Sequence, residues 1–287
     1  MLGYRNIILF LLIIALFLGA TVEISEGSDP LGILLFIIAV LLISQIKVGE
    51  SYMVSRSKLS MYVGALIIIS VIAYNLFTYS KQDTLDIMTF LGKLGTLDIM
   101  TFLLGLSLIA HNINNEEIRR MGSFGAYMSA TFIVLFLLFF SLFNYLNIDF
   151  MHLFDHYFVL LPSLFVIRML GFPIQVIAIE MVRIEGTEEM SVIIGGPCSG
   201  LYSMFLLIGI MVAYTRIEHI ERRKFYPLLV ITIGVAYLAN LVRVSILYIT
   251  GFYYGKEVMY AVHVHLGWII FVIVVAVLLY VLDRITR

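Results

Sequence analysis

Long apolar runs separated by short polar segments form the main pattern of this chain. A helix that crosses a membrane needs about 20 apolar residues, within a range of roughly 17 to 25. The pattern therefore predicts an all-α polytopic membrane protein with about eight transmembrane helices. The runs that come close enough to this length are 5–22, 31–47, 60–80, 96–112, 125–146, 199–215, 226–251 and 258–282.

Two of these runs need a further decision. The first resembles a signal peptide, but no small-residue cleavage site follows it, and we interpret it as the first span. The fourth carries Asp98 near its start and follows a duplicated sequence, "TLDIMTFL", at 84–91 and again at 96–103. This repeat is too short and too isolated to indicate a solenoid, and we interpret it as an insertion that lengthens a loop.

Two segments between the fifth and sixth runs have a different character. Residues 157–171 are apolar but short and contain Pro162 and Arg168, so we expect an interfacial or re-entrant helix. Residues 173–196 are rich in Val and Ile around a polar "EGTEE" sequence, which predicts a small extracytoplasmic β-hairpin. A simple connecting loop is an equally good interpretation of the second segment.

Composition excludes an ordinary soluble domain, because 62% of the residues are hydrophobic and only 13% are charged. No basic stripe indicates nucleic acid. A single cysteine excludes an internal disulfide and a metal site built from several thiolates, and we expect no metal or organic cofactor.

The distribution of basic residues predicts the orientation. Cytoplasmic loops carry an excess of Lys and Arg. The loops "KVGESYMVSRSK", "NINNEEIRRMG" and "TRIEHIERRKF", together with Arg5, Arg284 and Arg287, hold 12 of the 18 basic residues. The alternate loops "EISEGSDP" and "NYLNIDFMHLFDH" hold none. Both termini are therefore predicted to be cytoplasmic, and a full span at 157–171 would place the basic "RRKF" loop outside.

Three reactive side chains fall in the outer third of the membrane on this map. Cys198 precedes the sixth span, Arg243 lies in the seventh, and His263 lies about one turn into the eighth. A thiol at a helix N-terminus meets unsatisfied N–H groups that favour the nucleophilic thiolate. A histidine with its ordinary pKa of about 6.5 can carry the proton, and a buried arginine can stabilise a developing oxyanion.

Each of these residues also has a structural interpretation. A lone cysteine in a membrane helix is usually inert packing. Arg243 could pair with a carboxylate, although Asn240, one turn earlier on the same face, is a better partner to orient it. An intramembrane arginine is nevertheless a functional residue by default. Either His263 or His265 could be a hydrogen-bonded core residue.

Taken together, "PCSGLYS", "NLVRV" and "HVHLGWIIF" resemble the three motifs of the exosortase and archaeosortase family of membrane cysteine transpeptidases. The matching positions are Cys198-Ser199-Gly200, Asn240 with Arg243, and His263 with Gly267. The resemblance covers roughly 160–275, whereas the first 150 residues match only as hydrophobic spans. It implies that His263, spaced four residues from Gly267, is the catalytic histidine, with His265 as its rival.

The resemblance also implies a function. Members cleave the C-terminal sorting signal of exported proteins, which consists of a short motif, a transmembrane helix and a basic cluster. They pass the acyl group from the thiol to an acceptor, a lipid. We therefore expect a plasma-membrane enzyme with its active site near the outer face, an N-terminal bundle of five spans (1–156) and a catalytic core (157–287).

Three alternatives remain open at this point. A protease could use Cys198 without transfer to an acceptor. A transporter would also place charges within the membrane, although the chain shows no paired half-repeats. A serine protease using Ser199 would need glycine at position 197, where the chain has proline.

Overall fold

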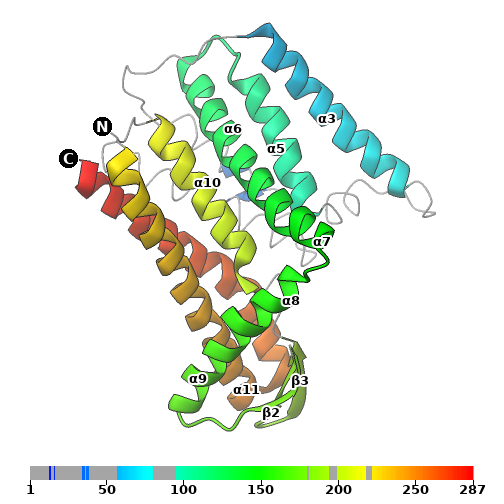
Figure 1. Cartoon of the computed structure of the whole chain (residues 1–287), viewed down its shortest axis with the longest axis vertical. Coiled ribbons are helices and arrows are strands. Elements are labelled where there is room, and N and C mark those ends of the chain that lie inside the picture. The colour runs from blue at the N-terminus through cyan, green and yellow to red at the C-terminus, as the bar shows by residue number, and fades with distance from the viewer. Residues whose placement is uncertain are drawn as a thin grey trace. The chain divides into compact units, whose positions relative to one another are not determined.

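The computed structural model describes residues 57–79, 95–179, 181–193, 199–217 and 222–286, together with positions 13, 16, 34, 35, 37 and 38. These residues are mostly helical, with one small sheet (Figure 1). The chain divides into two compact units. Unit 1 comprises Met1–Phe136, Phe205–Leu229 and Asp283–Arg287, and unit 2 comprises Leu137–Met204 and Val230–Leu282.

Three regular helices form the described part of unit 1 before residue 137. They are α3 (Lys58–Tyr79), α5 (Thr96–Ala110) and α6 (Glu116–Phe136), and α5 packs against both of the others. Glycines bring α3 and α5 close together: a Cβ atom added at Gly64 would lie 2.6 Å from the carbonyl O of Gly105. Small residues at such contacts let membrane helices approach closely.

The outer surface of α3 is apolar, as expected for a helix surrounded by lipid. Leu66 is 65% exposed and Phe77 is 75% exposed. The polar side chain of Asn75 is buried and donates to the carbonyl O of Val71, one turn earlier, at 2.9 Å. The helix therefore satisfies its own polar groups and leaves hydrocarbon on its surface.

By length and composition, four helices within the described residues can cross a membrane. Two of them coincide with the predicted spans 60–80 and 125–146, and one long helix contains 226–251 and most of 258–282. The four are Lys58–Phe77, Ile118–Leu142, Phe150–Met169 and Arg223–Leu278.

The remaining predicted spans have a different outcome. Thr96–Ala110 and Leu201–Arg216 are apolar helices at the predicted positions 96–112 and 199–215, but they are shorter than the four helices above. The predictions at 5–22 and 31–47, and the first repeat copy at 84–91, lie outside the described residues apart from isolated positions. A count of eight spans is therefore not confirmed.

The helix predicted at 157–171 begins earlier than expected. The segments α8 (Phe150–Phe154), η2 (Asp155–Leu160, a π-helical turn) and α9 (Leu161–Met169) follow one another without a break. The resulting stretch of 20 residues is long and apolar enough to cross a membrane by length and composition. Length does not separate a spanning helix from one that lies in the interface, so its interfacial or re-entrant placement stays a prediction. We had assigned the polar residues up to 156 to a loop, but Asp149 instead caps the helix by accepting from the backbone N of His152 at 3.3 Å.

A three-stranded antiparallel sheet follows α9. Its strands are β1 (Gln175–Ala178), β2 (Met181–Glu185) and β3 (Glu189–Ile193), in the order β1-β2-β3. The pair Glu185 and Glu189 closes the turn between β2 and β3. The predicted hairpin is therefore confirmed, and β1 adds a third strand that the sequence did not predict. The side of the membrane on which the sheet lies stays a prediction.

The last two helices are α10 (Leu201–Ile217) and α11 (Arg222–Thr286). Within unit 2, α11 is broken at Gly255, whose φ of 80° and ψ of −175° are not helical. The two parts of α11, which we call its first and second arms, run back along each other as an antiparallel pair (Figure 1). The predicted runs 226–251 and 258–282 are therefore two helices that meet at a single residue.

Candidate active site

The residues that follow Cys198 are anchored to the first arm of α11. Cys198 itself lies outside the described residues, but Ser199 and Gly200 are described and buried. Asn240 Nδ2 donates to the carbonyl O of Ser199 at 2.7 Å. The described hydrogen bond of Asn240 therefore runs to the cysteine segment, rather than to Arg243 as we had expected.

Gly200 is needed at this contact for two reasons. Its φ is +78°, a conformation that glycine adopts without steric cost. A Cβ atom at this position would also lie only 2.5 Å from Cγ of Asn240. The glycine of the Cys-Ser-Gly sequence is thus the surface on which the asparagine of the Asn-Leu-Val-Arg sequence packs.

A second glycine receives Arg243. Arg243 lies one turn after Asn240 and therefore on the same side of the first arm. A Cβ atom added at Gly267, on the second arm, would lie 2.9 Å from Nη2 and 3.1 Å from Cζ of Arg243. The guanidinium group consequently lies against the backbone of the second arm at a place that only glycine leaves open.

The two candidate histidines differ in their surroundings. His263 is half-buried and precedes Gly267, which receives the Arg243 guanidinium, by one helical turn. His265 is exposed. Two residues correspond to a rotation of about 200° around a helix, so His265 lies on the other side of the second arm, away from Gly267.

One charged residue escaped the sequence analysis. Asp155 is only 1% exposed and begins the π-helical turn η2. It lies in unit 2, which also holds the motif segments. The signal was an acidic residue next to an apolar run, and we missed it because we assigned residues up to 156 to a loop.

The arrangement brings together groups suited to acyl transfer. The Arg243 guanidinium lies against Gly267, one turn after His263, and the segment that carries the only cysteine is bonded one turn away from the arginine. Within the residues that the structure describes, no group of three or more His, Cys, Asp or Glu side chains could hold a metal ion.

Comparison with known proteins agrees with the motifs. The model of the transmembrane exosortase family matches residues 4–280. The chain belongs to this family. The match extends the resemblance of 160–275 to almost the whole exosortase chain, including the N-terminal region that the motifs do not cover. No curated protein and no solved structure matches the chain. Membership of the exosortase family indicates a membrane sorting transpeptidase that acts on membrane proteins bearing sorting signals.

Proposed function

We propose that this exosortase cleaves the C-terminal tripartite signal of exported proteins and transfers them to a lipid acceptor through a thioacyl intermediate on Cys198. The observation that carries the proposal is the pair of glycine contacts. Gly200 receives Asn240, and Gly267 receives Arg243. These contacts join the three motif segments inside unit 2.

In the first step, His263 takes the proton of the Cys198 thiol, and the sulfur attacks the carbonyl carbon of the scissile peptide bond. Arg243 stabilises the oxyanion of the tetrahedral intermediate, an effect that preorganised donors provide in acyl transfer. The C–N bond then breaks, and His263 returns the proton to the leaving amine. The products are a thioester on Cys198 and the released C-terminal helix.

In the second step, a nucleophilic group of the lipid acceptor attacks the thioester carbonyl. His263 removes the proton of that group, the C–S bond breaks, and the Cys198 thiolate is regenerated. Arg243 serves both steps because each passes through an oxyanion at the same carbon. Asn240 holds the backbone beside the nucleophile rather than touching the reacting atoms.

Variants of Cys198 and of the two histidines test this proposal. An epitope-tagged exported protein with a short motif, a C-terminal helix and a basic cluster is co-expressed in the host, and its processing is followed by gel mobility. We expect Cys198→Ala and His263→Ala to abolish processing at normal protein level, and His265→Ala to leave it intact. Normal processing by Cys198→Ala would overturn the proposal.

The mass of the processed protein separates transfer from hydrolysis. We expect a C-terminal residue linked to lipid. A free carboxylate at the cleavage site would show that the protein hydrolyses its substrate as a protease and does not transfer it.

The single cysteine also allows a direct test of orientation. We expect a membrane-impermeant maleimide to label Cys198 in intact cells, because the proposal places the site near the outer face. Labelling only after the membrane is opened would contradict that placement.

A further inference from the structure

The turn between β2 and β3, residues 186–188, meets α11 at its break. The backbone N of Thr187 donates to the carbonyl O of Phe252 at 2.9 Å. Thr187 Oγ1 donates to the carbonyl O of Tyr253 at 2.7 Å and lies 3.2 Å from that of Phe252. These carbonyls belong to the last turn of the first arm, where helical partners are missing. Thr187 therefore caps the C-terminal end of the first arm.

The next residue caps the second arm. Glu188 Oε2 accepts from the backbone N of Lys256 at 3.2 Å. Lys256 is the first residue after the break, where N–H groups lack helical partners and the helix dipole favours a negative charge. Two consecutive residues of one turn thus cap both arms of α11.

Two glycines make this fit specific. A Cβ atom at Gly186 would collide with the carbonyl O of Phe252, and one at Gly255 would lie 3.0 Å from the carboxylate of Glu188. Gly255 also needs its φ of 80° to break the helix. The absence of a side chain at Gly186 and Gly255 therefore lets the turn pack closely against α11 at its break.

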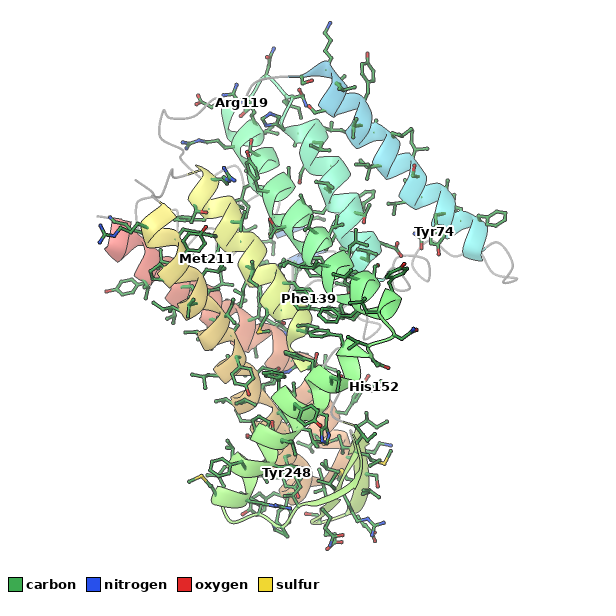
Figure 2. All side chains as sticks on the ribbon, viewed as in Figure 1. Tyr74, Arg119, Phe139, His152, Met211 and Tyr248 are labelled. Atoms are coloured by element: carbon green, nitrogen blue, oxygen red, sulfur yellow. The ribbon has the colours of Figure 1, made fainter. Side chains whose placement is uncertain are left out.

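The sheet behind the turn is itself fixed to the first arm. Tyr248, labelled in Figure 2, donates its hydroxyl to the carbonyl O of Pro173, just before β1. Val182 and Ile184 of β2 are almost fully buried, and Cδ1 of Ile184 lies 3.3 Å from where a Cβ at Gly251 would be. These contacts fix the sheet to the first arm. The turn therefore cannot move relative to α11 unless the sheet moves with it.

We propose that Thr187 and Glu188 are positioning residues that set the angle and register between the arms of α11, and through them the placement of Arg243 against Gly267 on the arm that carries His263. Arg243 and Gly267 are each 12 residues from Gly255, or about 18 Å along their arms. At that distance a change of about 5° in the angle moves one arm by about 1.5 Å relative to the other. A misplacement of about 1 Å can slow a reaction by about 100-fold.

The angle can be measured without any substrate. Nitroxide labels are placed on Leu238→Cys and Ile273→Cys, exposed positions on the first and second arms, in the full chain carrying Cys198→Ala. Distances between the labels are compared for Thr187→Val and Glu188→Gln, alone and combined. Matched controls are Thr187→Ser, which keeps the hydroxyl, and Glu189→Gln, whose carboxylate faces Arg183 instead of α11.

We expect the distance distribution to broaden or shift in the Thr187→Val and Glu188→Gln variants and to match the unsubstituted protein in both controls. Identical distributions in the single variants and in the combined variant would overturn the proposal.

The link to catalysis rests on the proposed function and is tested by the processing assay. We expect kcat to fall about 10-fold to 100-fold in Thr187→Val, with KM changed less than about twofold and kcat restored by Thr187→Ser. An unchanged kcat beside a changed distance would remove the catalytic role. Processing by Cys198→Ala would refute the proposed function, whereas the distances would still decide whether the turn positions the arms.

Discussion

The two units of the protein are built on different principles. In unit 1, the described helices α3, α5 and α6 are unbroken and meet through glycines such as Gly64 and Gly105. In unit 2, the helices are interrupted by the π-helical turns η1 (Leu137–Leu142) and η2 and by the break at Gly255. An unbroken helix satisfies its own backbone, whereas an interrupted one needs partners from elsewhere.

Polar side chains of unit 2 form hydrogen bonds with the backbone where its helices are interrupted or end. In unit 2, Thr187, Glu188 and Asn240 all bond to backbone groups of another segment. In unit 1, Asn75 bonds to its own helix, and the bonds of Asn112 to Ser57 and Ser60 join the end of α5 to the start of α3, away from the motif segments. Unit 2 is thus the part in which irregular backbone and buried polar groups form a site, and substitutions in the two units should have different consequences.

The largest effect is expected at Gly267. Gly267→Ala places a methyl group 2.9 Å from Arg243 Nη2 and should displace the guanidinium, reducing processing by about 100-fold or more. The matched control is Gly234→Ala, where nothing lies within 4 Å of the new methyl group. Processing per folded molecule is measured with the tagged protein. A normal rate in Gly267→Ala would mean that the reaction does not need Arg243 at this position.

A smaller effect is expected at Asn240. Asn240→Ala removes the hydrogen bond to the carbonyl O of Ser199, which should lower the free energy of unfolding by about 1–3 kcal/mol. Processing should fall by about 10-fold, because the backbone beside Cys198 loses its anchor.

The control for Asn240 lies in unit 1. Asn75→Ala removes another buried amide, whose hydrogen bond among the described residues runs to Val71 of its own helix. It should leave processing per folded molecule unchanged. Equal losses of processing in the two variants would contradict the distinction between the units.

In unit 1, Gly64→Ala should affect stability but not chemistry. The new methyl group would lie 2.6 Å from the carbonyl O of Gly105, so α3 and α5 must move apart at a cost of about 1–3 kcal/mol. The thermal unfolding midpoint in detergent should fall, while processing per folded molecule stays within about twofold. Leu66→Ala, at a site 65% exposed, is the control expected to leave the midpoint almost unchanged.

The smallest effect is expected on the exposed face of the sheet. Arg183 Nη1 lies 3.5 Å from Glu189 Oε1, with side chains 41% and 69% exposed. Such pairs contribute about 0–1 kcal/mol, so Arg183→Gln should change neither the unfolding midpoint nor processing measurably. A marked loss of processing would show that this face takes part in function.

Much of the secondary structure followed from local pattern. The richness in Val and Ile around the polar "EGTEE" sequence predicted β2 and β3, because β-branched residues bounded by turn residues favour strands. The four-residue strand β1 escaped prediction: it is exposed throughout and its pairing with β2 is irregular between Val176 and Ala178. The break in α11 was predicted as a loop of several residues, but one glycine in a left-handed conformation suffices because the 186–188 turn caps both sides.

The sequence by itself determined that the chain is a helical membrane protein, and it gave the motif residues with their spacing, since hydrophobic length and residue type are local properties. It could not determine which side chains pack against the glycines of those motifs. Only the tertiary structure paired Gly200 with Asn240 and Gly267 with Arg243, and joined the β2–β3 turn to Gly255. Each of these contacts joins segments distant in sequence, and the packing of helices and sheet in three dimensions decides which of them meet.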